Sequence, residues 1–248
     1  MKQNFKMTVS YDGSRYFGWE HQPGTDMTIQ GKLERVLERM VDDRDQVTVI
    51  GAGRTDAGVH ALAMTANFIL DTDLSEDQIR DYMNRYLPDD ISVRDLKVCA
   101  DRFHSRFKAK GKTYRYTFYI GKDKPVFDRK YVTRLERMPD VAAMRRAAEL
   151  LCGMHDFKSF CGNSHMKKST VRLVDKIEVS HKGSYLTLTF HGSGFLQNMV
   201  RIMTGTLLEV GQGKRKPEEM TEILEALDRK AAGPTAPACG LALVSVDY

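Results

Sequence analysis

The chain of 248 residues lacks any apolar run of about 18 residues, the length that a helix needs to cross a bilayer. We therefore expect no membrane partner. The start of the chain also lacks the charged-then-apolar pattern of a secretory signal, which favours a cytoplasmic protein. With 42% hydrophobic and 29% charged residues, the composition is typical of a globular protein with a sizeable core.

Cysteine and histidine are few and scattered. The four cysteines form no C-x-x-C pair, so we predict free thiols rather than a zinc or redox site. The seven histidines include no H-E-x-x-H motif and no ligand cluster. A catalytic metal is therefore not expected.

Charge is unevenly divided, although the net charge is only +5. Residues 1–100 carry 12 Lys and Arg against 17 Asp and Glu, whereas residues 101–248 carry 26 against 16. A basic half is typical of a protein that binds a polyanion. A solvated basic surface without a partner is the alternative.

Two helices and four strands are predicted in the first part of the chain. Thr28 is a candidate helix N-cap, and Ser75 with Gln78 forms a capping-box pattern. The expected elements are strands over residues 4–11, 47–50, 63–70 and 91–99, with one helix after Thr28 and another after Ser75. The order β-α-β-β-α-β is the ferredoxin-like arrangement.

The second part of the chain approximately repeats that order. Asp140 is a candidate N-cap, and Lys182–Gly183 is a candidate hairpin turn. The expected elements are strands over residues 112–120, 170–180, 184–191 and 240–246, with helices after Asp140 and over about 195–209 and 217–228. We therefore predict an α+β protein with two ferredoxin-like domains, residues 1–104 and 105–248.

A glycine-rich segment, residues 51–60, separates two expected strands. Arg54 and Asp56 lie two residues apart, so they point the same way in extended backbone. The segment is not a Walker A loop, which needs Gly-Lys-Ser/Thr at the start of a helix. It is not a Rossmann loop either, because a strand follows and Asp56 takes the third glycine position. The pattern alone allows a functional carboxylate or a tight turn with a surface Arg–Asp pair.

Residues 101–119 combine cations with aromatic rings, including Lys108, Lys110 and Lys112. Cations suit phosphates and rings stack on unpaired bases, so the segment is a candidate RNA-binding region. Within the expected strand, Tyr114 and Tyr116 share one face. The alternative is that most of these rings belong to the core.

Arg201 is the one ionisable residue between Phe195 and Leu208. So apolar a helix is expected to be buried, and a buried guanidinium needs an anionic partner. Arg201 shares a helix face with Asn198 and Gly205, a small and polar strip that suits the lining of a cleft. The alternative is an arginine at the helix edge that extends to water.

The run Gly-Arg-Thr-Asp-Ala-Gly-Val-His at residues 53–60 resembles the signature of the tRNA pseudouridine synthase A family. Other motifs match in the family's order and cover most of the chain. They are Tyr11-Asp12-Gly13 with Gly18-Trp19, Phe103-His104 with Arg106, Lys112-x-Tyr114-x-Tyr116, Asp156-Phe157 with Ser159-Phe160, Met199-Val200-Arg201, and Gly240-Leu241 running to Val246-Asp247-Tyr248.

The resemblance implies two ferredoxin-like halves that share a continuous antiparallel sheet, with a central active-site cleft. It implies conversion of uridine to pseudouridine in the anticodon stem-loop of tRNA, at positions 38–40, by a homodimer that grips one tRNA. Because the reaction is an isomerisation, it implies no cofactor.

The resemblance also implies roles for single residues. Asp56 is the expected catalytic aspartate, and Arg54 is expected to help displace and hold the flipped nucleotide. Tyr114 is expected to stack against the target base, and Arg201 to pair with Asp56.

One departure from the family is visible at residue 20. Many relatives have Gln after the tryptophan, whereas this chain has Glu20 and then His21. An acidic side chain in a substrate-facing loop can alter which RNA is accepted, so ribosomal RNA is an alternative substrate. A non-catalytic RNA-binding module is the alternative from another class, and it would not need an intact Asp56.

Overall fold

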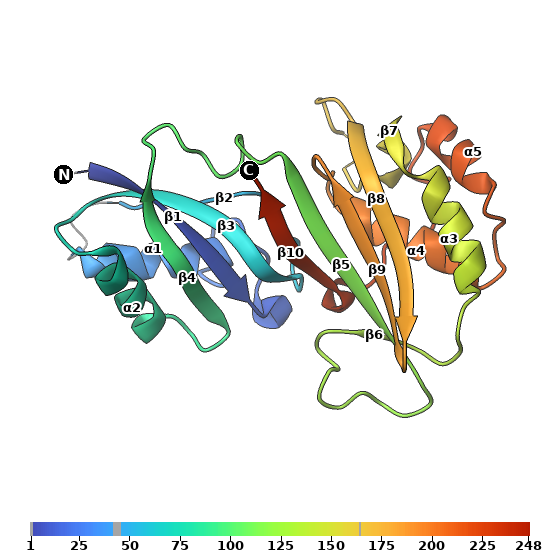
Figure 1. Ribbon diagram of the computed structural model, residues 1–248, viewed down its shortest axis with the longest axis horizontal. Helices are drawn as coiled ribbons and strands as arrows, with labels where there is room; N and C mark the ends of the chain where they lie inside the picture. Colours follow the sequence, from blue (N-terminus) through green and yellow to red (C-terminus); the bar gives the residue numbers. More distant parts are fainter. Residues whose placement is uncertain (1, 42–45, 164) are drawn as a thin grey trace. The chain divides into compact units, whose positions relative to one another are not determined.

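The chain forms two compact units in the computed structural model, which describes residues 2–41, 46–163 and 165–248 (Figure 1). The first unit runs to Lys110 and also contains Leu243–Tyr248, and the second contains Gly111–Ala242. The end of the chain thus returns to the unit in which the chain begins. The proposed boundary at residues 104 and 105 does not include this return, because pairing between distant strands leaves no local pattern.

The first unit has the β-α-β-β-α-β order that the sequence predicts. Its elements are β1 (Lys2–Tyr11), α1 (Ile29–Met40), β2 (Ile50–Gly51), β3 (His60–Asp71), α2 (Glu76–Tyr86) and β4 (Ile91–Cys99). Thr28 caps α1 by accepting a hydrogen bond from the Gly31 amide at 3.2 Å. Ser75 and Gln78 form the predicted capping box of α2.

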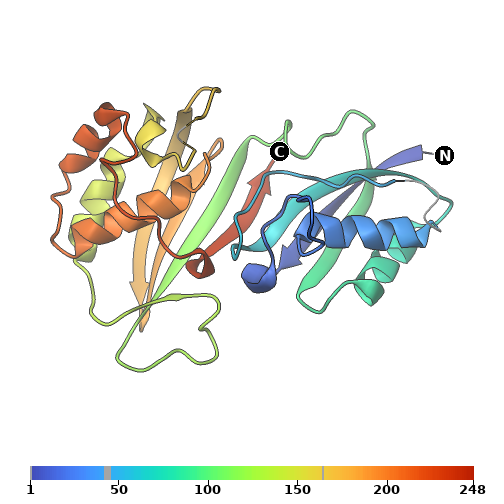
Figure 2. The ribbon, with the colours of Figure 1, turned by 180° about the vertical axis from the view of Figure 1, so that it is seen from behind.

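The sheet of the first unit is antiparallel, with β1 between β4 and β3. Phe5 lies opposite Phe68, and Met7 lies opposite Ala66. These alternate side chains are buried, and Figure 2 shows α1 and α2 covering the sheet. The core therefore lies between the sheet and the two helices, as the period-two pattern requires. The short strand β2 pairs with β3 and leads into the glycine-rich segment.

The second unit contains an antiparallel sheet in the order β5-β9-β8-β7, with helices packed on it (Figure 1). Its elements are β5 (Gly111–Ile120), β6 (Thr133–Leu135), α3 (Val141–Leu150), β7 (Gly153–Asp156), β8 (Val171–Lys182), β9 (Tyr185–Gly192), α4 (Met199–Gly211) and α5 (Glu219–Ala226). The last strand, β10 (Leu241–Asp247), belongs mainly to the first unit. The α+β fold with a mostly antiparallel sheet is therefore confirmed.

Three details differ from the sequence-based expectations. The strand expected over residues 47–50 is limited to Ile50–Gly51. The helix expected from about residue 195 begins at Met199, because Asn198 has a left-handed backbone with φ of 58°. Strands β6 and β7 were not expected, since three or four residues are too few for a visible period.

Among the described residues, no helix is long and apolar enough to cross a membrane.

Candidate functional site

Arg54 and Asp56 lie on the turn between β2 and β3 in the first unit. Arg54 is exposed, Asp56 is half-buried, and Thr55 between them is only 7% exposed. This alternation agrees with the expectation that Arg54 and Asp56 point the same way. The Thr55 hydroxyl is hydrogen-bonded to the hydroxyl of Tyr11 at 2.8 Å, within the core. The turn is therefore anchored to β1 at the residue next to Asp56.

The segment between β1 and α1 packs directly against this turn. The Trp19 amide donates a hydrogen bond to the Thr55 carbonyl at 3.1 Å, and the Gly58 amide donates to the Tyr16 carbonyl at 3.2 Å. Tyr16 and Trp19 are both buried. One backbone hydrogen bond before Asp56 and one after it thus fix the path of the turn.

Two glycines make this close packing possible. A Cβ on Gly18 would lie 2.5 Å from the Thr55 carbonyl oxygen, and a Cβ on Gly13 would lie 2.0 Å from the Val59 carbonyl oxygen. Gly18 also has a φ of 99°, a conformation that favours glycine. Glycine at positions 13 and 18 therefore allows the close packing that fixes the position of Asp56.

The carboxylate of Asp90 also holds the segment between β1 and α1 in place. The Asp90 carboxylate accepts hydrogen bonds from the Tyr16 hydroxyl at 2.6 Å and from Arg15, whose Nε lies 2.5 Å away. Burial, and then the hydrogen bond to Asp90, raises the pKa of Tyr16 to about 12. Sequence reasoning missed this brace, because Asp90 lies more than 70 residues along the chain from its partners.

His60 completes the packing at the end of the motif. Its buried ring accepts a hydrogen bond from the Gly13 amide at Nδ1, over 3.0 Å. The same Nδ1 lies 3.2 Å from Asp12 Oδ1. The hydrogen bond from Gly13 joins the start of β3 to the segment that packs against the Asp56 turn. His60 was not among the predicted site residues, although it is the last residue of the matched motif.

Arg54 has an acidic neighbour in the segment between β1 and α1. Its guanidinium forms an ion pair with Glu20, and both side chains are about half exposed. The pair stands in solvent, where exposed ion pairs contribute about 0–1 kcal/mol. Arg54 is therefore held only weakly and can exchange Glu20 for another anion.

The basic aromatic segment begins in the first unit, where buried polar groups hold its backbone. The Asn4 amide group donates hydrogen bonds to the carbonyls of Ala100 and Phe103, at 3.1 and 2.9 Å. Asn67 accepts from the amide and the hydroxyl of Ser105, each at 2.8 Å. This network fixes residues 100–105 to β1 and β3.

The outer part of the segment is exposed. Phe107 is 79% exposed, and its ring lies 4.1 Å from that of His104. Lys108 and Lys110 are exposed, whereas Lys112 is half-buried in β5. Rings and cations thus stand together in solvent around Phe107, as an RNA-binding segment requires.

In the second unit, Tyr114 lies on β5 and is 8% exposed. Its ring meets that of Phe195 edge-on, with centroids 5.3 Å apart. Tyr116 and Phe118 share its face but are fully buried, and burial raises the pKa of Tyr116. For these two rings the alternative of an ordinary core position is correct.

Arg201 lies in the first turn of α4, half-buried and held at fixed positions. Its Nε donates to the Ala236 carbonyl at 2.7 Å, and Nη1 donates to Asn198 Oδ1 at 3.0 Å. Arg201 therefore contacts Asn198 as expected, although Asn198 precedes the helix instead of sharing a helix face with Arg201. The bond to the Ala236 carbonyl was not foreseen. The structure places Arg54, Asp56, Lys108 and Lys110 in the first unit, and Lys112, Tyr114 and Arg201 in the second.

Within the described part of the chain, no three His, Cys, Asp or Glu residues come together in a way that could hold a metal ion.

Comparisons with known proteins identify the family. A family model described as tRNA pseudouridine synthase matches residues 7–108 and 147–248. The chain is 44% identical to tRNA pseudouridine synthase A of Geobacillus sp. (strain WCH70), over 100% of this chain and 99% of that one. It is 42% identical to tRNA pseudouridine synthase A of Bacillus sp. (strain KSM-64), over 99% of each chain. The chain belongs to the tRNA pseudouridine synthase family.

Proposed function

We propose that this protein converts uridine to pseudouridine in tRNA and that Asp56 is the carboxylate on which the reaction depends. The observation that carries the proposal is the Asp56 turn itself. A half-buried carboxylate stands on a turn held by backbone hydrogen bonds from Trp19 and Gly58 and by close glycine packing. Such a turn places one acidic group with little freedom to move, which is the requirement for acting on a bound nucleotide.

The chemistry needs an anion and a shaped site rather than a cofactor. The bond between N1 and C1′ of uridine breaks, the base rotates, and a bond forms between C5 and C1′. The proton on C5 is released and N1 gains one, so the overall reaction is an isomerisation. Attack by a carboxylate on C1′, attack on the base, and removal of a ribose proton all require an ionised group such as Asp56 against the uridine.

Other residues supply binding. We propose that Arg54 holds the displaced nucleotide, because its exposed guanidinium can exchange Glu20 for a phosphate. The ring of Tyr114 stacks against the target base, and Arg201 pairs with Asp56. Removing a base from its stack costs a few kcal/mol, which favours uridines in loops and at weak stem ends.

The RNA itself is held by the segment around Phe107. Its exposed ring and the exposed Lys108 and Lys110 offer a stacking surface and two phosphate contacts, and Lys112 adds a cation at the start of β5. We propose the anticodon stem-loop as the target, a homodimer as the active form and the cytoplasm as the compartment. Sedimentation of the protein with and without tRNA tests the dimer.

Tritium release tests the activity. An unmodified tRNA transcript labelled at C5 of uridine is incubated with wild type, with Asp56→Asn and with Asp73→Asn, a matched change at an exposed carboxylate. We expect release from wild type and Asp73→Asn, and none above background from Asp56→Asn, which keeps its tRNA affinity. Release by Asp56→Asn would contradict the role of this carboxylate.

Ribosomal RNA is the second candidate substrate, because the acidic Glu20 lies beside Arg54, at the position where many relatives have Gln. Pseudouridine maps of tRNA and ribosomal RNA from cells with and without the gene separate the two. Loss of sites from tRNA alone supports tRNA as the substrate.

A further inference from the structure

Residues 121–134 connect β5 to β6 and include the first two residues of β6 (Figure 1). This segment is strongly basic and contains none of the site residues described above. We call it the basic loop. It contains five Lys and Arg residues and two Asp residues, and one of these, Asp128, accepts a hydrogen bond from the Tyr185 hydroxyl. The cations are Lys122, Lys124, Arg129, Lys130 and Arg134.

Hydrogen bonds within the basic loop hold it in one conformation. The Gly121 amide donates to the Leu135 carbonyl at 3.0 Å. Arg134 donates from Nε to the Gly121 carbonyl at 3.0 Å and from Nη2 to the Lys122 carbonyl. Arg129 donates to the Val126 carbonyl at 2.5 Å. A loop that is already ordered loses little entropy when it binds a ligand.

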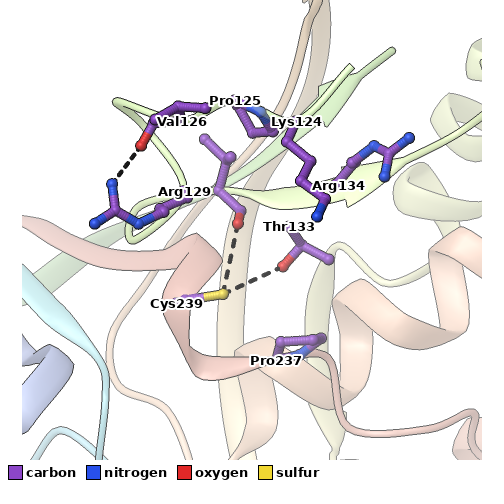
Figure 3. A pocket seen from close by; sticks show the side chains of 9 residues that line it. Lys124, Pro125, Val126, Arg129, Thr133, Arg134, Pro237 and Cys239 are labelled. Carbon is purple, nitrogen blue, oxygen red and sulfur yellow. Dashed lines mark hydrogen bonds between the residues drawn. The ribbon is translucent and has the colours of Figure 1, made fainter. Parts of the chain in front are cut away.

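A hollow of about 340 Å³ opens beside the loop (Figure 3). Lys124, Arg129 and Arg134 supply its cations. The rest of its lining is mainly apolar and comes from Pro125, Val126, Val132, Thr133, Pro237 and Cys239. Pockets for small ligands have volumes of about 300–1,000 Å³, so this hollow suits about one nucleotide. Its mixture of cations and apolar surface matches a phosphate joined to a sugar and a base.

The exposed face of the loop carries aromatic and aliphatic groups among the cations. Phe127 is 94% exposed, next to Val126 at 58%, and Tyr131 is 46% exposed. A phenyl ring at this exposure contributes nothing to the core and is accessible to a partner. A ring between cations is the arrangement by which proteins stack on unpaired bases and contact the neighbouring phosphates.

A protein partner fits this surface less well. The cores of protein interfaces are depleted in lysine, and their apolar patches are contiguous. Here the exposed Lys122, Lys124 and Arg129 are interspersed along the loop with its exposed apolar side chains. Charge therefore favours RNA as the occupant.

We propose that the basic loop is a second RNA-contacting surface, on which Phe127 stacks against an unpaired base and the surrounding cations contact phosphates. The proposal deepens the function proposed above and depends on it for the identity of the RNA. It adds binding energy without taking part in the chemistry at Asp56.

Two sets of variants test the surface without disturbing the loop. Lys122→Gln/Lys124→Gln removes two ammonium groups that have no hydrogen-bond or ion-pair partner within the described residues. The matched control, Lys182→Gln/Lys214→Gln, removes two exposed cations elsewhere in the same unit. Phe127→Leu removes the ring but keeps an apolar side chain, and Phe127→Tyr keeps the ring.

Equilibrium binding to an unmodified tRNA transcript is measured over a range of salt concentrations. Phe127→Leu is expected to raise Kd by about 5- to 150-fold, the range for the loss of one stacked base. Phe127→Tyr, which keeps the ring, is expected to bind with the wild-type Kd. Lys122→Gln/Lys124→Gln is expected to raise Kd and to lower the salt slope by about 1.4–1.8, while its control leaves the slope within error. At saturating tRNA, tritium release should keep the wild-type rate.

Failure of this proposal is distinct from failure of the proposed activity. If wild type releases tritium and the loop variants bind tRNA as wild type does, the basic loop does not contact RNA. A change in sedimentation with unchanged tRNA affinity would also overturn the proposal, in favour of a contact between two copies of the chain. If wild type binds tRNA without releasing tritium, the activity fails, and the loop is still judged by its Kd values.

Discussion

The Asp56 turn and the basic loop are both connections between strands, yet they are built in opposite ways. The Asp56 turn is packed against Gly13 and Gly18, with contacts too close for any other side chain. The basic loop is held by hydrogen bonds among its own residues and leaves its side chains, Phe127 above all, in water. The Asp56 turn requires glycine at fixed positions and holds a single carboxylate in place. The basic loop keeps exposed side chains available for a large partner.

This difference separates the two requirements of an enzyme that acts on RNA. A reacting group must stay within a fraction of an ångström of its target, so its support has to be rigid. Contacts to phosphates act as exposed charges and tolerate variation in position. Substitutions near Asp56 should therefore change the rate of reaction, and substitutions in the basic loop should change affinity for RNA.

Apart from Asp56→Asn, the largest combined loss of activity and stability is expected for Gly18→Ala. The new methyl group would lie 2.5 Å from the Thr55 carbonyl oxygen, so the turn has to move by more than a bond-angle adjustment allows. We expect tritium release to fall by about 100-fold, the effect of a shift of about 1 Å in a catalytic group. We also expect the free energy of unfolding to fall by about 2 kcal/mol or more.

Gly24 provides a matched control for this prediction. It also has a positive φ, of 82°, but a Cβ there would have no neighbour within 4 Å. Gly24→Ala is expected to lose about 1–2 kcal/mol of stability from backbone strain and to keep the wild-type rate. Equal losses of activity in both variants would mean that strain, rather than the contact with the Asp56 turn, is responsible.

Arg201→Leu is expected to have the next largest effect. The guanidinium is held by Ala236 and Asn198, so it is a fixed cation rather than a mobile one. Removing a fixed electrostatic group from an active site lowers kcat by about 10²- to 10³-fold. We expect a loss of about 100-fold in tritium release with little change in tRNA affinity, and Arg201→Lys should recover only part of it. Near-normal release by Arg201→Leu would limit Arg201 to a structural role.

A smaller effect, on the pH dependence of stability, is expected from the hydrogen bond between Tyr16 and Asp90. The pKa of Tyr16 in the folded protein is about 12, above its ordinary value of 10.0. Neutral Tyr16 therefore contributes its full stabilisation below about pH 10, and this contribution is lost as the pH rises from about 10 to about 12. Unfolding by urea should show wild type losing stability faster than Tyr16→Phe over that range. Parallel curves for the two proteins would contradict a shifted pKa at Tyr16.

Sequence patterns predict those features that depend on neighbouring residues. The helix cap at Thr28, the capping box at Ser75 and the alternating strand that contains Tyr114 each involve residues at most four positions apart, and all three are present. The motif that contains Asp56 identified the family for the same reason, because it is a continuous run of residues.

Features that depend on distant residues were not visible in the sequence. Asp90 braces Tyr16 across 74 positions, and the Ala236 carbonyl holds Arg201 across 35. The basic loop was overlooked for a different reason. Its charge is present in the sequence, but only the structure shows Phe127 in water and a hollow beside the cations.

The smallest effect is expected for Glu20→Gln, and it tests whether the Asp56 turn includes one adjustable group. The ion pair between Glu20 and Arg54 is half exposed, so breaking it should change stability by less than about 1 kcal/mol. If Glu20 competes with RNA for Arg54, its removal should lower the KM for tRNA by up to about fivefold and leave kcat unchanged. Glu178→Gln, which breaks the exposed ion pair with Lys176, is the matched control and should not alter KM.

A double-mutant cycle of Glu20→Gln and Arg54→Gln shows whether Glu20 affects KM through Arg54. In an Arg54→Gln background, Glu20→Gln should have no further effect on KM, because the group that Glu20 restrains is gone. An equal gain with and without Arg54 would mean that Glu20 repels RNA as a general negative charge. In that case the Asp56 turn would be rigid throughout, and adjustment to different RNAs would depend on exposed surfaces such as the basic loop.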